Sequence, residues 1–266
     1  MEGTLTPSVV ALLCRTSDRE GFRAEGAQAV AEAIAQQLGV TARLVGSPGE
    51  SLDSTYDEDL RDSRGCLLEA GGQLSDAFHE RRLPVLCAGA CSICVTTLPV
   101  LARDRPDAFV LWLDAHADFN SPETSPSKFL GGMCLAGACG VWDTGFDGPK
   151  LDPARVVMSG VRDIDPGERE LLETHHVSLI DRPSRLADAL AGREVFVHLD
   201  VDVLDPSVMP GMAYPVPGGS SAEGLASLLR DVASAATVIG IEVTGCPTAA
   251  GAQVVAPAVA ALLGRE

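Results

Sequence analysis

The chain has 266 residues, of which 46% are hydrophobic and 21% are charged, and its formal net charge at pH 7 is −17. This length fits one α/β domain or two small ones. The acidic balance disfavours nucleic acid and membranes as partners, because both carry negative charge, and it suits a cationic ligand.

Segments typical of strands and helices alternate along the chain. We expect strands at 8–14, 41–46, 83–89, 108–114, 155–161, 177–181, 194–205 and 237–245. We expect helices at 20–39, 58–80, 92–104, 165–175, 183–192, 221–235 and 251–264, and loops rich in Gly and Pro at 119–132 and 206–220. Apolar strands that alternate with helices are typical of a mostly parallel sheet covered on both faces. No linker divides the chain, so we predict one three-layer α/β/α domain over residues 1–266.

The cysteines and the N-terminus predict a cytoplasmic location. The apolar stretch VVALLC is too short for a signal peptide, and no run approaches the roughly 18 apolar residues of a membrane span. The eight cysteines form no spaced framework, so we interpret Cys14, Cys66 and Cys139 as free, buried thiols in a reducing compartment. Cys87, Cys91 and Cys94 suggest zinc, but no second cysteine pair follows at zinc-finger spacing.

Acidic side chains follow three of the expected strands. AFVLWLD ends at Asp114, EVFVHLD ends at Asp200, and TVIGIEV contains Glu242. An unpaired buried carboxylate is costly, so three such strand ends indicate one shared positive partner, most simply a metal cluster. Ligands of parallel sheets bind at these carboxyl ends of strands.

The spacing within two segments favours ligands for two metals. In Asp114-Ala-His116-Ala-Asp118, a period of two puts three side chains on one face if the chain stays extended. Asp200 and Asp202 repeat this spacing on a second strand. Oxygen-rich ligation with one imidazole suits Mn²⁺ better than zinc. A single D-x-D pair is usually a strand-end turn or a helix cap, but two such segments after apolar strands favour a metal site.

Four motifs resemble the arginase/agmatinase (ureohydrolase) superfamily: DAHADFNSP, VRDIDPGERE, HLDVDVLDPSVMPGMAYPVPGG and IEVTG. They occur in that family's order, and the resemblance runs from about residue 83 to the C-terminus. It implies a three-layer α/β fold, two manganese ions per chain, and hydrolysis of a guanidino or similar C–N bond. VRDIDPGE is more similar to arginases than to agmatinases, which implies an amino-acid substrate.

The resemblance also implies roles for individual residues. Those that match the family's metal ligands are Asp114, His116, Asp118, Asp200 and Asp202, with Asp114 and Asp200 at the bridging positions. Glu242 matches the carboxylate that contacts the guanidinium. Asn120 and Ser127 fall where arginases hold the α-carboxylate, and Asp165 and Glu168 where they contact the α-amino group.

Two motifs depart from the family pattern. The family's first ligand motif, G-G-D-H-S, reads AGACS here, so Cys91 stands in the place of a ligand histidine. This change is compatible with a working cysteine ligand, a labile first site or a degenerate protein. Where arginases carry a proton-shuttling histidine before a glycine, this chain has Leu130-Gly131-Gly132. We place His198, two residues before Asp200, in the core or behind the ligands.

A cysteine ligand and a missing shuttle together are similar to the branch that acts on N-ω-hydroxy-L-arginine and gives ornithine and hydroxyurea. We expect that substrate first and L-arginine next, with Glu242 holding the guanidinium, the metals activating water, and Asp118 carrying the proton to the departing amine. Two alternatives stay open: a metal-binding homologue without catalysis that has a regulatory role, and a zinc deacetylase-like hydrolase. The sequence leaves open whether the chain forms an oligomer.

Overall fold

The computed structural model describes residues 5–19, 23–180 and 182–264. Eight strands form one sheet in the order β2-β1-β3-β8-β7-β4-β5-β6, and every neighbouring pair is parallel. The strands are β1 (Pro7–Leu12), β2 (Arg43–Val45), β3 (Leu83–Cys87), β4 (Phe109–Leu113), β5 (Val156–Ser159), β6 (Ser178–Leu179), β7 (Glu194–Asp200) and β8 (Thr237–Thr244). The helices are α1 (Arg23–Leu38), α2 (Tyr56–Asp62), α3 (Arg64–His79), α4 (Cys94–Asp104), α5 (Cys134–Ala138), α6 (Pro166–Thr174), α7 (Pro183–Leu190), α8 (Ala222–Ala235) and α9 (Ala249–Leu262).

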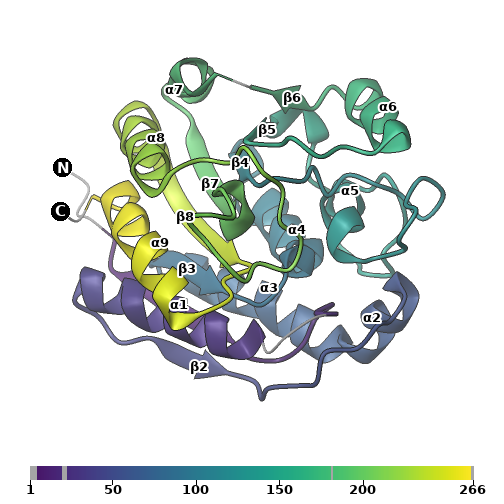
Figure 1. Ribbon diagram of the computed structural model, residues 1–266, viewed down its shortest axis with the longest axis horizontal. Helices are drawn as coiled ribbons and strands as arrows, with labels where there is room; N and C mark the ends of the chain where they lie inside the picture. The colour runs from purple at the N-terminus through teal and green to yellow at the C-terminus, as the bar shows by residue number, and fades with distance from the viewer. Residues whose placement is uncertain (1–4, 20–22, 181, 265–266) are drawn as a thin grey trace.

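The sheet lies between two layers of helices (Figure 1). α1, α8 and α9 enclose one hydrophobic core on one face, and α3, α4 and α5 enclose a second core on the other. Side chains alternate along each strand: Leu111 and Leu113 of β4 belong to the first core, whereas Val110 and Trp112 belong to the second. The predicted three-layer α/β fold is confirmed, and the sheet is parallel throughout.

Most differences from the expected elements concern helix boundaries. The helix expected at 58–80 is two helices, α2 and α3, which meet at Ser63. The short helix α5 was not predicted, because five residues are too few to show a helical period. Residues 20–22 of the first expected helix and residue 181 of an expected strand lie outside the described residues.

The strand order brings four distant segments to one edge of the sheet. From β3 the chain crosses to β4, and only later do β7 and β8 fill the space between them. The carboxyl ends of β3, β8, β7 and β4 therefore lie side by side, which is the usual ligand position in a parallel sheet. None of the helices in the described ranges is long and apolar enough to cross a membrane.

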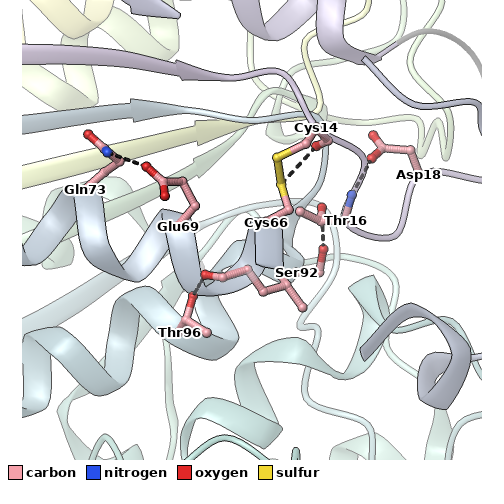
Figure 2. Close-up of a disulfide and its surroundings, with 9 residues drawn as sticks. Cys14, Thr16, Asp18, Cys66, Glu69, Gln73, Ser92 and Thr96 are labelled. Carbon is pink, nitrogen blue, oxygen red and sulfur yellow. Dashed lines mark hydrogen bonds between the residues drawn. A yellow bond between two sulfur atoms is a disulfide. The ribbon is translucent and has the colours of Figure 1, made fainter. Parts of the chain in front are cut away.

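One prediction about the cysteines is wrong. Cys14, just after β1, and Cys66 of α3 form a disulfide (Figure 2). Their separation of 52 residues offered no sequence signal, and only the packing of α3 near the end of β1 brings them together. Cys139 is free and buried, as expected. The cytoplasmic location, which was argued partly from reduced thiols, stays a prediction.

Candidate metal centre and substrate cavity

A cavity of about 520 Å³ opens at the carboxyl ends of the central strands. Its walls include the residues that the sequence analysis placed at the metals or the substrate, with one exception, Glu242. Those that line it are Cys91, Asp114, His116, Asp118, Asn120, Ser127, Asp165, Glu168, Asp200 and Asp202. Four segments of the chain, at 91, 114–127, 165–168 and 200–202, thus converge on one space.

The segment after β4 presents its three side chains through bends. The strand ends at Leu113 and the chain bends at Asp114, so the condition of an extended segment is not met. The amide of His116 donates to Asp114 Oδ1 at 2.7 Å. Asp118 has a φ of 51°, in the left-handed region, where a residue with a Cβ is uncommon. Asp118 nonetheless lines the cavity, so the turn aims its carboxylate at the same space.

The segment after β7 also bends. Asp200 ends the strand, and a single 3₁₀ turn, Val201–Val203, carries Asp202. Asp200 Oδ1 accepts a hydrogen bond from the amide of Asp202 at 2.8 Å. Asp202 Oδ1 accepts one from the amide of Ala115 at 2.9 Å, which ties the β7 segment to the β4 segment. Backbone amides thus fix the orientation of both carboxylates.

Cys91 faces this cluster, as its motif position predicts. Its Sγ lies 2.9 Å from Asp200 Oδ2, 4.0 Å from Asp114 Oδ2 and 3.1 Å from the hydroxyl of Thr244. Cys91 begins the 3₁₀ turn Cys91–Ile93 after β3. The neighbouring Ser92 donates to the hydroxyl of Thr16 at 2.8 Å, close to the disulfide (Figure 2). The N-terminal loop therefore helps to hold the turn that carries this thiol.

The electrostatics of the cluster call for positive charge. Burial, followed by neighbouring carboxylates, raises the pKa of Asp114 well above its usual value, and burial also raises that of Asp200. Burial alone would lower the pKa of His116, but hydrogen bonds to Asp114 and Asp202 raise it to about 12. Without metal, protons held by the carboxyl groups and by His116 therefore compensate the negative charge of the cluster. Bound divalent cations would compensate the same charge.

The donor atoms fit two adjacent cations. Ligand atoms of Asp114, His116 and Asp202 lie within 4.8 Å of one another, and so do those of Cys91, Asp114 and His198. Asp114 belongs to both groups, which matches the bridging position that the family resemblance implies. Carboxylates with an imidazole suit a Mn²⁺-type ion, and the thiol adds a softer donor on one side.

Glu242 does not line the cavity, and the expected contact with the guanidinium is not supported by its placement. Its side chain is fully buried, with Oε2 accepting a hydrogen bond from Thr97 at 2.7 Å and Oε1 lying 2.7 Å from His198 Nδ1. Strand register explains this placement. Thr244 is level with Asp200, whereas Glu242 is level with His198, one pleat deeper in the sheet. His198 is itself fully buried and lies two residues before Asp200 on β7.

The residues expected to bind an amino acid line the cavity next to Asp118. Asp165 caps α6 and accepts a hydrogen bond from Asn120 Nδ2 at 3.0 Å. Glu168 accepts hydrogen bonds from the amides of Phe119 at 2.8 Å and Asp165 at 3.2 Å, and burial raises its pKa to about 7. Ser127 lines the same cavity. These groups can receive a cationic amino group through oxygen acceptors.

Sequence reasoning missed several residues at the mouth of the cavity. Arg19, from the N-terminal loop, lies over the ring of Phe129 at 4.9 Å, and Tyr214 packs against the same ring at 5.3 Å. A Cβ at Gly131, where the shuttle histidine would stand, would lie 2.4 Å from the Phe129 ring. The ring of Phe129 therefore occupies the space that a side chain at position 131 would need. Tyr214 lies in the expected 206–220 loop, which could have been flagged, whereas Arg19 carried no sequence signal.

Comparisons with known proteins agree with this architecture. The chain matches the arginase family model over residues 10–264. It is 36% identical over 253 residues to the N(omega)-hydroxy-L-arginine amidinohydrolase of Streptomyces lavendulae, across 94% of this chain and 92% of that protein. It is 31% identical over 185 residues to the arginase of Bacillus subtilis strain 168, across 62% of each. The crystal structure of arginase from Bacillus subtilis has the same fold, with a TM-score of 0.84 at 24% identity, covering 98% of this chain and 99% of that one.

Proposed function

Since this chain belongs to the arginase family of hydrolases, we propose that it cleaves the guanidino C–N bond of N-ω-hydroxy-L-arginine at two manganese ions, giving ornithine and hydroxyurea. L-Arginine is the next candidate substrate. The observation that carries the proposal is one cavity lined by the carboxylates of two strand-end segments, by the thiol of Cys91 and by groups suited to bind an amino acid. The relative from Streptomyces lavendulae, whose name states this substrate, supports the choice.

The metals would be held by the residues at the floor of the cavity. The family resemblance assigns this role to Cys91, Asp114, His116, Asp118, Asp200 and Asp202, and all six side chains line the cavity. Two divalent cations held by these residues would supply a water activated as a nucleophile near neutral pH. The hydrogen bonds from backbone amides to Asp114, Asp200 and Asp202 keep these side chains in place before metal binds.

The amino-acid end of the substrate would bind beside Asn120, Ser127, Asp165 and Glu168. Asp165 and Glu168 offer negative charge to the α-amino group, and Asn120 is held beside them by its hydrogen bond to Asp165. Ser127 would contact the α-carboxylate. With this end fixed, the side chain of the substrate extends toward the metal floor, which presents the guanidino carbon to the nucleophile.

Proton transfer in this cavity would rely on Asp118. It lines the cavity beside the other candidate ligands, so its carboxylate would lie near the departing amine and could pass a proton to it. The place of the family's shuttle histidine is taken by Gly131 and the Phe129 ring. An N-hydroxyguanidine is less basic than a guanidine, so its hydrolysis makes a smaller demand on a shuttle. This difference favours the hydroxylated substrate.

A panel of guanidino compounds tests the proposal. Protein reconstituted with Mn²⁺ is assayed with N-ω-hydroxy-L-arginine, L-arginine and agmatine, and the products are scored for urea and hydroxyurea. We expect the highest kcat/KM for the hydroxylated amino acid and a poor value for agmatine, which lacks the α-carboxylate. Agmatine turned over as efficiently as the amino acids would contradict the amino-acid wall. Two bound metals without turnover of any compound would favour the non-catalytic alternative.

A further inference from the structure

A buried histidine–glutamate pair lies directly beneath the candidate metal floor. His198 of β7 and Glu242 of β8 are both fully buried and directly opposite each other in the sheet. His198 Nδ1 lies 2.7 Å from Glu242 Oε1, and Thr97 of α4 donates to the other carboxylate oxygen at 2.7 Å. In the tautomer whose Nδ1–H donates to this carboxylate oxygen, the lone pair of the ring lies at Nε2.

The second ring nitrogen of His198 has no partner. Nε2 is buried and makes no hydrogen bond within the described part of the chain. A buried polar atom left unpaired costs on the order of 1–3 kcal/mol, so such an atom in a native fold needs an explanation. The lone pair of this nitrogen can accept a hydrogen bond or bind a cation.

Two candidate metal ligands, Cys91 and Asp114, lie near the imidazole of His198. A ring nitrogen of His198, Sγ of Cys91 and a carboxylate oxygen of Asp114 all lie within 4.8 Å of one another. Because Nδ1 is engaged by Glu242, Nε2 is the nitrogen free to face this group. Trp112 stacks on the imidazole at 3.5 Å with an interplanar angle of 2°, which fixes the plane of the ring.

We propose that His198 is a ligand of the cation that Cys91 and Asp114 would hold, and that Glu242 is the positioning residue of the imidazole. A metal-ligating histidine usually donates its other N–H to a carboxylate, and the Glu242–His198 pair has this arrangement. Cys91 stands where the family has a ligand histidine, so this position lacks an imidazole. His198 of β7 supplies one instead. The inference rests on the dinuclear centre proposed above and adds a ligand to it.

The competing explanation is that His198 only packs against Trp112 and supports Glu242. The two explanations differ in what a metal does to the ring. Direct ligation to a paramagnetic ion shifts the Nδ1–H resonance far from its usual position, and burial protects that proton from exchange with solvent. A packing residue shows no such shift. Ligation by His116 does not produce the same signal, since its ring is partly exposed at the cavity and its N–H exchanges.

The experiment uses the full chain loaded with Co²⁺ and proton NMR, together with Mn²⁺ titrations. We expect a strongly shifted, solvent-protected imidazole N–H in the wild type, which disappears in His198→Gln. That variant keeps a donor for Glu242, and it should weaken one of two Mn²⁺ sites by about tenfold or more. Trp112→Phe, which keeps an aromatic ring against His198 and removes no ligand atom, should leave both Mn²⁺ affinities unchanged.

Three outcomes decide the matter. A shifted, protected N–H that is lost in His198→Gln supports ligation. If the wild type binds two metals but shows no such resonance, the inference is overturned and the proposed function still stands. Equal Mn²⁺ affinities in the wild type and His198→Gln have the same consequence. A wild-type chain that binds no divalent metal overturns both. The wild-type spectrum decides even if the variant fails to fold.

Discussion

Replacing Glu168 by glutamine should change how the stability of the metal-free protein depends on pH. The Glu168 side chain is 4% exposed, and burial raises its pKa from an ordinary value of 4.5 to about 7. A carboxyl group whose pKa is higher in the folded than in the unfolded state holds its proton more tightly when folded. Its contribution to stability is therefore present at low pH and is lost as pH rises from about 4.5 to about 7.

The two pKa values set the magnitude. Linkage between 4.5 in the unfolded state and about 7 in the folded state gives a loss of about 2.5 kcal/mol between pH 5 and pH 8. Glutamine has the shape of glutamate without its charge, so the variant lacks this loss. The difference in free energy of unfolding, Glu168→Gln minus wild type, should be about 2.5 kcal/mol more positive at pH 8 than at pH 5. Comparing two pH values subtracts any constant change in hydrogen bonding.

Urea denaturation followed by circular dichroism measures these free energies, with a chelator present so that metal binding does not contribute. Glu170→Gln is the matched control, because Glu170 is exposed on the same helix, and it should leave the pH dependence as in the wild type. An unchanged pH dependence in Glu168→Gln would refute the argument that burial holds this carboxyl group protonated. In the assay with N-ω-hydroxy-L-arginine at pH 8, where most Glu168 side chains are ionised, the same variant should raise KM, since it removes a negative charge beside the α-amino group.

Three further predictions concern the metals and the disulfide. In Asp200→Ala/Asp202→Ala, elemental analysis after Mn²⁺ reconstitution should fall well below the two metals per chain of the wild type, and unchanged occupancy would argue against this centre. Cys91→Ala should weaken one metal much more than the other and Cys91→His should restore binding, because imidazole suits manganese better than a thiolate; equal binding in all three proteins would make Cys91 a bystander. Reducing the Cys14–Cys66 disulfide, which closes a separation of 52 residues, should cost up to about 4 kcal/mol of stability in urea denaturation, whereas coinciding curves before and after reduction would refute this.

The sequence by itself determined the alternation of strands and helices, the parallel sheet, and the set of acidic side chains at strand ends. Each of these depends on local patterns. Apolar runs flanked by helical periods identify the strands, and the carboxylates at Asp114 and Asp200 follow them directly. The DAHAD and DVD motifs also carried the family resemblance, which the comparisons confirm.

Tertiary structure decided how far along its strand each side chain lies relative to the side chains of neighbouring strands. A period of two tells which face of a strand a residue occupies, but the register between β7 and β8 depends on packing between segments 44 residues apart. That register puts Glu242 beside His198 under the metal floor and brings Thr244 level with Asp200. Likewise, only the packing of α3 near the end of β1 pairs Cys14 with Cys66. Contacts between distant segments leave no local pattern, because the partners are set by how the layers pack and not by neighbouring residues.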